Sequence, residues 1–135
     1  ICACLVGSEM CIRDRFIADD FAHEQSIVFE TEKGLVIFNS CSHGGIANIV
    51  REVQNAFAGK KIYAVIGGFH MMKLSGLDTL GIPVDEVVKV ARELKELGVE
   101  KVYTGHCTGM IAFEIMKREL GNMVHALNTG CRIEI

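Results

Sequence analysis

The sequence lacks the features that mark several large classes of protein. No apolar run approaches the ~18 residues that a membrane-spanning helix needs, so no transmembrane segment is expected. The formal net charge is −3, and no cluster of basic residues extends beyond Lys60 and Lys61. This composition argues against binding to nucleic acid through neutralisation of phosphates. Repeats, low-complexity tracts and linkers are also absent, so we expect one domain in these 135 residues.

The sequence contains cysteines, but their positions do not suggest a framework of disulfide bonds. Three of the six cysteines lie in the first fifteen residues, and Cys41, Cys107 and Cys131 lie in the body of the chain. Neither Cys41 nor Cys107 has a C-x-x-C partner, so neither a disulfide scaffold nor a zinc finger is expected. The N-terminal residues have no basic start and no small-residue cleavage site, unlike a secretion signal. A reducing, cytoplasmic location fits this pattern best.

The first fifteen residues differ in character from the rest. Residues 4–15 resemble translated sequencing-adaptor read-through, so we expect 1–15 to be a non-native segment that packs poorly and 16–135 to be the domain. The alternative is a genuine apolar strand.

Half of all residues are hydrophobic and the mean hydropathy is +0.30. A chain of this composition is expected to bury part of its apolar surface against additional polypeptide or another partner, as well as within its own core.

Apolar residues recur with strand-like and helix-like periods in turn, which predicts an α/β fold. Strands are expected over 26–30, 34–39, 62–66, 99–104, 123–127 and 132–135. Helices are expected over 46–57, from Pro83 to the glycine at 98, and over 110–120. A polar turn at 31–34 predicts a hairpin between the first two strands. Residues 71–81 show little periodicity and are interpreted as a loop that covers a site.

Three histidine motifs stand directly after strand-like runs. They are Cys-Ser-His-Gly-Gly at 41–45, Gly-Gly-Phe-His at 67–70 and Gly-His-Cys-Thr-Gly at 105–109. Ligands and metals collect at the carboxyl ends of strands in layered α/β proteins, because loops from several strands converge there. The glycines let backbone approach a metal or an anion closely, and imidazole binds Zn, Fe, Ni and Cu. We therefore expect a site at this edge of the sheet.

The residues around these histidines are expected to form the loops or to contact substrate. This set consists of Ser42, Gly44, Gly68, Thr108 and Gly109. The alternative for each histidine is a capped loop residue without a ligand.

The remaining cysteines and histidines carry weaker expectations. Cys41 and Cys107 are expected to be small buried fillers beside the site, although Cys107 adjoins a helix start that would favour a nucleophilic thiolate. His23 and His125 are expected to be solvated or satisfied by hydrogen bonds.

The three motifs, in this order and spacing, resemble the C-terminal half of a metallo-β-lactamase-fold protein. More narrowly, they resemble the subgroup that includes the dihydropterin–ribofuranosylaminobenzene phosphate synthases of methanopterin biosynthesis. Residues 19–21 and 24–26 resemble the entry to that subgroup's hairpin, so the match covers about 17–135. One local departure is Asn39-Ser40 before Cys41, where relatives usually carry a glycine, and we expect it to tilt the loop.

The resemblance implies a four-layer αββα sandwich with a metal pair between its two sheets. It implies that His43 and His106 are metal ligands, with zinc the first choice and Mg, Mn or Fe as alternatives. His70 falls where many relatives carry a bridging carboxylate, so both a metal contact and a substrate contact remain open for it. A neutral imidazole offers one lone pair and no negative charge, which favours the substrate contact.

The superfamily's His-x-His-x-Asp-His loop does not occur in this sequence. We therefore expect a fragment whose main catalytic residues and N-terminal half lie upstream, and which is inactive alone. The parent reaction would be hydrolysis by metal-activated water, or condensation of a pterin pyrophosphate with an aminobenzene-ribose phosphate. The expected partner is thus a small molecule containing pterin or phosphate, and a homo-oligomer remains open. The alternatives are a non-catalytic metal- or phosphate-binding module and a cysteine enzyme centred on Cys107.

Overall fold

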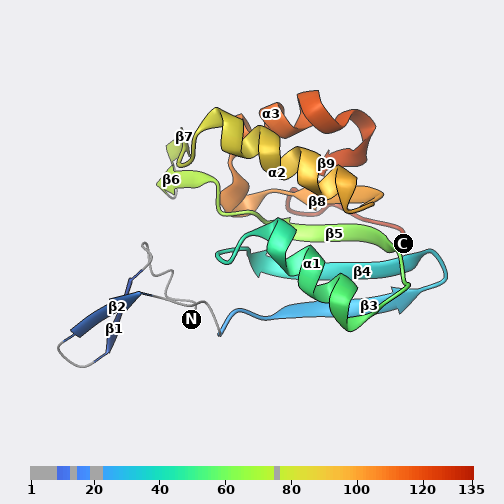
Figure 1. Ribbon diagram of the computed structural model, residues 1–135. Helices are drawn as coiled ribbons and strands as arrows, with labels where there is room; N and C mark the ends of the chain where they lie inside the picture. The colour runs from blue at the N-terminus through green and yellow to red at the C-terminus, as the bar shows by residue number, and fades with distance from the viewer. Residues whose placement is uncertain (1–8, 13–14, 19–22, 75–76) are drawn as a thin grey trace.

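The computed structural model of the protein describes residues 9–12, 15–18, 23–74 and 77–135. Its centre is a five-stranded sheet (Figure 1). The strands are, in spatial order, β3 (Ser26–Thr31), β4 (Gly34–Cys41), β5 (Ile62–Gly68), β8 (Lys101–Thr104) and β9 (Val124–Ala126). The predicted hairpin joins β3 to β4 in antiparallel register, whereas all other neighbours in this sheet pair in parallel. The carboxyl ends of β4, β5 and β8 therefore share one edge of the sheet.

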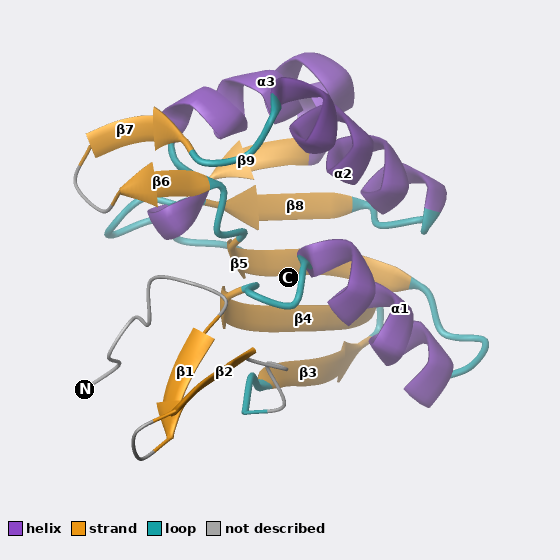
Figure 2. Cartoon of the chain, turned by 60° about the vertical axis from the view of Figure 1, so that its left-hand side comes forward, coloured by secondary structure: helices purple, strands orange, loops and turns teal. Residues whose placement is uncertain are grey.

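Three helices cover one face of this sheet (Figure 2). They are α1 (Ile46–Ala56), α2 (Val84–Glu96) and α3 (Met110–Leu120). Their apolar stripes and the facing strand residues form one core, in which Leu35, Val50 and Val87 are fully buried. Each such side chain stabilises the fold by about 1.5–3 kcal/mol relative to exposure. None of the helices in the described residues has the length and apolar character that crossing a membrane requires.

The opposite face of the sheet is also apolar. Val36, Ala64 and Ile66 form a second buried cluster, against which Leu127 and Ile133 of the C-terminal segment pack. The sheet also carries two exposed side chains on β3, Ile27 at 61% and Phe29 at 55%. A sheet with helices on one face and apolar side chains on the other is the arrangement that a layered α/β sandwich requires. The predicted fold class is confirmed at this level.

Most of the predicted elements are present, but two predictions were wrong. The segment expected to be a loop contains an antiparallel pair, β6 (Met72–Leu74) with β7 (Leu77–Leu80), and Met71 before it is buried in the core at 2% exposure. These strands are too short to show a period. Residues 132–135 form no strand, because they have no neighbour in the sheet. Two short 3₁₀ helices, η1 (His106–Thr108) and η2 (Gly121–Met123), flank α3.

The N-terminal part of the chain contributes a separate two-stranded sheet. β1 (Glu9–Ile12) pairs with β2 (Arg15–Ala18) in antiparallel register. Residues 1–8 and 13–14 of the expected non-native segment lie outside the described residues. The domain division at residue 15 stays a prediction.

Candidate metal centre

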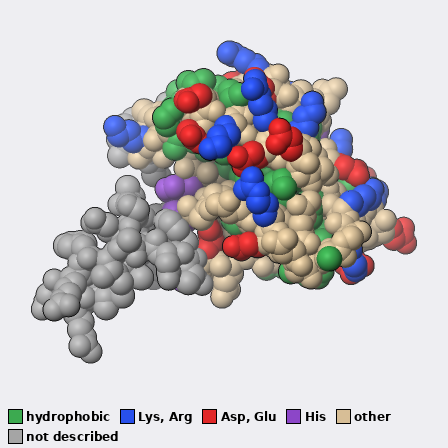
Figure 3. All heavy atoms as spheres, in the orientation of Figure 1, with side chains coloured by type: hydrophobic (Ala, Val, Ile, Leu, Met, Phe, Trp, Pro, Cys, Tyr) green, Lys and Arg blue, Asp and Glu red, His purple; other side chains and the backbone are tan. Residues whose placement is uncertain are grey.

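The strand ends bring the three motif histidines together. His43, His70 and His106 each lie two residues beyond the last residue of β4, β5 and β8, respectively. The rings of His43 and His70 lie 4.1 Å apart between centroids, tilted by 42°, and His106 is close enough to affect the charge state of His70. Figure 3 shows histidine side chains gathered at one place on the visible face. The predicted convergence at the edge of the sheet is therefore present.

Two of these histidines have a backbone conformation that is uncommon for residues with a side chain. Within the described part of the chain, the non-glycine residues with positive φ are His70 and His106, both at 52°. Such conformations cost free energy and persist where the surroundings fix them, which is often at functional sites. His70 and His106 therefore have a backbone geometry of the kind that is often found at functional sites.

The surroundings of His70 favour its neutral form. Burial is the main cause that lowers the pKa of His70 below the ordinary value for histidine, and the neighbouring His43 and His106 lower it further. The carboxylate of Glu24 acts in the opposite direction. A neutral imidazole keeps a lone pair available for a metal, or for a proton from a substrate.

Glu24 holds the loop that carries His43. Its two carboxylate oxygens accept hydrogen bonds from the backbone N–H groups of His43 and Gly44, at 2.8 and 2.9 Å. Charge-assisted bonds of this kind are about twice as strong as neutral ones. The sequence placed Glu24 before the hairpin, but no local pattern connected it to a loop about twenty residues later. Sequence reasoning therefore missed this residue.

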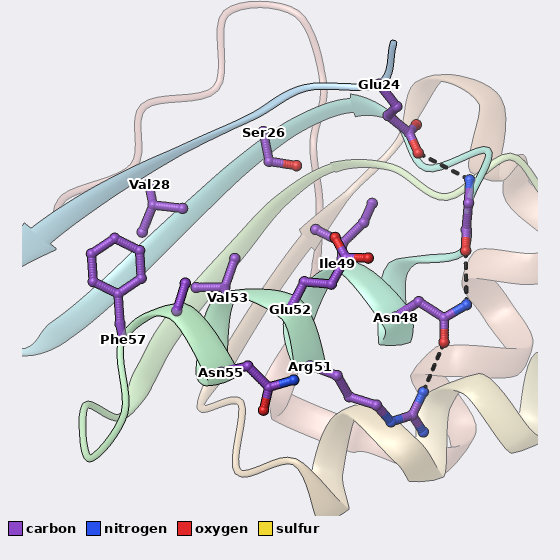
Figure 4. A pocket seen from close by; sticks show the side chains of 12 residues that line it. Glu24, Ser26, Val28, Asn48, Ile49, Arg51, Glu52, Val53, Asn55 and Phe57 are labelled. Carbon is purple, nitrogen blue, oxygen red and sulfur yellow. Dashed lines mark hydrogen bonds between the residues drawn. The ribbon is translucent and has the colours of Figure 1, made fainter. Parts of the chain in front are cut away.

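Hydrogen bonds extend from this loop along α1 as far as Arg51 (Figure 4), and a further bond joins Arg51 to α2. The carbonyl of Gly44 accepts a bond from Asn48 Nδ2 at 2.8 Å, and Asn48 Oδ1 accepts one from Arg51. Arg51 then pairs with Glu93 of α2 at 2.9 Å. Gly44, Asn48 and Arg51, but not Glu93, line a groove of about 700 Å³ between α1 and the start of β3. The groove meets the candidate centre only at Glu24 and Gly44, because none of the three histidines lines it.

Ser42 supports the loop from within. It is 2% exposed, and both its backbone N–H and its hydroxyl donate to the carbonyl of Gly68, at 3.0 and 2.9 Å. The hydroxyl also accepts a bond from Asn39 Nδ2 at 2.8 Å. A register shift between Asn39 and Cys41 marks an irregularity in β4 at this point. The side chain at position 39 thus takes part in the loop's support rather than only displacing it.

Thr108 plays a similar part beside His106. It is 1% exposed, its Oγ1 accepts a bond from the N–H of Phe69 at 2.9 Å, and it lies 2.6 Å from the hydroxyl of Thr104. Gly109, at φ 76°, turns the chain from η1 into α3. These bonds fasten the turn that presents His106 to the ends of β5 and β8.

Two thiols also reach the centre. The sulfur atoms of Cys41 and Cys107 and a ring nitrogen of His106 all lie within 4.8 Å of one another. Both cysteines are half-buried rather than fully buried, and neither forms a disulfide within the described structure. The backbone N–H of His70 donates to Cys107 Sγ at 3.2 Å. This donor set, with soft sulfur and borderline nitrogen atoms, fits a divalent ion such as zinc better than Mg or Mn.

The two other histidines of the described region do not follow β4, β5 or β8: His23 precedes β3, and His125 lies on β9. His23 is exposed. His125 on β9 stacks on Tyr103 with centroids 5.0 Å apart, and its buried Nε2 has no hydrogen-bond partner within the described structure. The expectation of a satisfied ring therefore does not hold for that nitrogen. Burial, Lys101 and Lys117 lower the pKa of His125.

Comparison with known proteins identifies relatives of this arrangement. No family model matches the chain. It is 35% identical over 116 residues to the 7,8-dihydropterin-6-methyl-4-(beta-D-ribofuranosyl)-aminobenzene-5'-phosphate synthase of Methanocaldococcus jannaschii, a match that covers 86% of this chain and 37% of that protein. The crystal structure of Tm1679, described as a metal-dependent hydrolase of the β-lactamase superfamily, superimposes with a TM-score of 0.79 at 35% identity.

The chain spans less than half the length of these relatives. The structural match covers 94% of this chain and 46% of the hydrolase. The sequence match and the structural match both have 35% identity, and both support the same relationship. The resemblance predicted from the three histidine motifs is therefore confirmed. The chain shares the fold of the metallo-β-lactamase superfamily and is related in sequence to the dihydropterin–ribofuranosylaminobenzene phosphate synthase subgroup.

Proposed function

We propose that this chain supplies one part of the metal centre of a metallo-β-lactamase-fold enzyme, and that His43 and His106 are metal ligands there. The observation that carries the proposal is the convergence of three histidines at the ends of three adjacent parallel strands, with His43 and His70 in ring contact at 4.1 Å. The positive φ of His70 and His106 adds support, since that strain is otherwise unexplained.

Each residue of the centre has a distinct part in this proposal. Glu24 fixes the loop of His43 through two backbone N–H groups, and Thr108 fixes the turn of His106 through Phe69. His70, whose pKa is lowered chiefly by burial, is assigned to contact with the substrate. A divalent metal bound there, zinc by preference, would supply Lewis-acid chemistry at a water molecule or at a departing phosphate group.

The substrate is proposed to be a small molecule that carries a phosphate group. The synthase relative is named for a dihydropterin product that carries a ribofuranosyl-aminobenzene phosphate, and the structural neighbour is named as a hydrolase. Two reactions follow from these names: transfer of a pterin group onto an aminobenzene, and hydrolysis. The chain would act with further protein that completes the centre, because it corresponds to 37% and 46% of the two relatives. Cys41, Cys107 and Cys131 form no disulfide within the described structure, which suits a reducing, cytoplasmic setting.

A chimaera tests this function. The 116 matched residues of this chain would replace the corresponding residues of the Methanocaldococcus jannaschii synthase, and both synthase and phosphate-ester hydrolase activities would be measured with and without a chelator. Chelator-sensitive activity that is lost in His43→Ala supports the proposal. A folded chimaera without either activity contradicts it. The isolated chain is expected to be inactive. If it binds metal stoichiometrically and the chimaera has no activity, the chain is instead a metal-binding module.

A further inference from the structure

Three potential ligand atoms converge from the ends of β4 and β8. Cys41 Sγ, His106 and Cys107 Sγ offer one atom each within a 4.8 Å span. In a tetrahedral zinc site with Zn–S bonds of about 2.3 Å, neighbouring ligand atoms lie roughly 3.8 Å apart. The observed span therefore exceeds that of a metal site by no more than about 1 Å, a difference that side-chain rotation covers. The three groups are close to ligating geometry without movement of the strands.

A glycine of β5 provides the space that this cluster occupies. Gly68 is the register partner of Cys41 on the adjacent strand. A Cβ atom added at Gly68 would lie 2.7 Å from Cys107 Sγ and 3.3 Å from the ring of His106. The first distance is shorter than real Cβ contacts allow, and the same Cβ would lie 2.9 Å from the carbonyl of Ser40, so any other residue at this position would displace the sulfur and the backbone of β4. The absence of a side chain at Gly68 thus leaves room over β5 for the side chains of Cys107 and His106.

The surrounding hydrogen bonds hold the cluster in place. Thr108 closes η1 through its bond to Gly105 O at 3.0 Å and anchors the turn to Phe69. The N–H of His70 points to Cys107 Sγ at 3.2 Å. An N–H donor to sulfur stabilises a thiolate, and such outer contacts orient ligands in metal sites. The cluster is therefore supported by the same turns that present the histidines.

The chemistry of the three donors selects the kind of cation. Two thiolates and one imidazole leave one tetrahedral position open, which is the ligand pattern of one class of catalytic zinc sites. Thiolates bind zinc, cobalt(II) and cadmium strongly and have little affinity for Mg, Mn or Ca. No carboxylate belongs to this cluster in the described residues.

We propose that Cys41 and Cys107 are thiolate ligands that, together with His106, hold one thiophilic divalent cation beside His43 and His70. The inference rests on the proposed function in that His106 serves the same metal centre. It goes further, because it assigns two cysteines as ligands and makes the ion at this position zinc-like rather than magnesium-like.

Cobalt(II) spectroscopy on the full chain tests this assignment. The chain would carry serine in place of Cys2, Cys4, Cys11 and Cys131, so that only the two proposed ligands remain, and would be titrated with CoCl₂ under argon with a non-thiol reductant. The expected result is a thiolate-to-cobalt charge-transfer band in the near ultraviolet that saturates at one equivalent. Cys41→Ser or Cys107→Ser should each reduce the band by about half. A large excess of Mg²⁺ should leave it unchanged.

Two other outcomes separate this inference from the proposed function. Cobalt that binds with a visible d–d spectrum and loses that spectrum in His106→Ala, but shows no thiolate band, overturns the cysteine assignment and leaves the proposed function in place. No cobalt binding at all overturns the cysteine assignment, and the chimaera then decides the proposed function separately. If the four-serine chain fails to fold by circular dichroism, the wild-type chain is titrated instead and compared with Cys41→Ser and Cys107→Ser. Cys131→Ser is then the matched control, because Cys131 is exposed and outside the cluster, and an equal loss in all three variants overturns the assignment.

Discussion

Removing the Glu24 carboxylate should loosen the loop that carries His43. In Glu24→Ala the N–H groups of His43 and Gly44 lose their charged acceptor. A hydrogen bond to a charged group contributes about 1.5–3 kcal/mol where it is buried, and the half-buried position of Glu24 reduces this through solvent. We expect the free energy of unfolding to fall by about 1–2 kcal/mol. If ordering of the loop is then needed before metal can bind, metal affinity should fall by about tenfold, since 1.4 kcal/mol corresponds to that factor.

The measurement is urea denaturation of the chain, paired with calorimetric titration of cobalt. Glu24→Gln keeps one acceptor oxygen and loses the charge, so its effects should be intermediate. Glu52→Gln is the matched control, because Glu52 is exposed on α1 and lines the same groove without belonging to the hydrogen-bond chain. Unchanged stability and metal affinity in Glu24→Ala, or an equal loss in Glu52→Gln, would refute the positioning role.

Four further predictions concern the histidines and the N-terminal segment. In the chimaera, His43→Ala and His106→Ala should each lower metal content and activity together, as measured by mass spectrometry of the metal beside turnover; full metal content in either variant removes that residue from the ligand set. His70→Ala should weaken substrate binding or turnover while most metal stays bound, and loss of a whole metal equivalent would make His70 a ligand. Because the folded pKa of His125 lies below the unfolded value of about 6.5, the unfolded state takes up the proton first. Stability should therefore fall as the pH is lowered through about 6.5, and less so in His125→Phe, by urea midpoints at several pH values; equal pH dependence in both proteins contradicts this. Deletion of residues 1–15 should cost less than ~2 kcal/mol by the same assay, and a larger loss would mean real core burial.

The sequence determined the order of elements and the place of the site because both depend on local patterns. Helix α3 has the bounds that its apolar spacing and the following glycine predict, and each of the three histidines follows a strand that contains buried apolar residues. Parallel strands place their carboxyl ends at one edge of the sheet. Motifs that directly follow such strands are therefore expected to lie close together, and the sequence alone is enough to predict this. That part of the site was predictable.

The remaining features depend on contacts between distant residues or on very short elements. Glu24 acts on backbone groups about twenty residues away, and the space above Gly68 exists only where three strands meet. The β6–β7 pair is too short for a period, and its neighbour Met71 is part of the core although its surroundings read as loop. Residues 132–135 have a strand-like composition but form no strand. Ile133 instead packs against the face of the sheet, which buries an apolar side chain without strand pairing.

The central claim is that His43 and His106 bind a metal, and the anomalous diffraction of zinc-loaded chimaera crystals tests it most directly. Data collected on both sides of the zinc absorption edge identify an anomalous peak as zinc, because the signal is present above the edge and falls sharply below it. The account predicts an anomalous peak about 2.0–2.1 Å from a ring nitrogen of His43 or His106, with both imidazoles bound to the metal centre. A fully occupied zinc peak elsewhere, with neither imidazole in bonding distance of an ion, would contradict it.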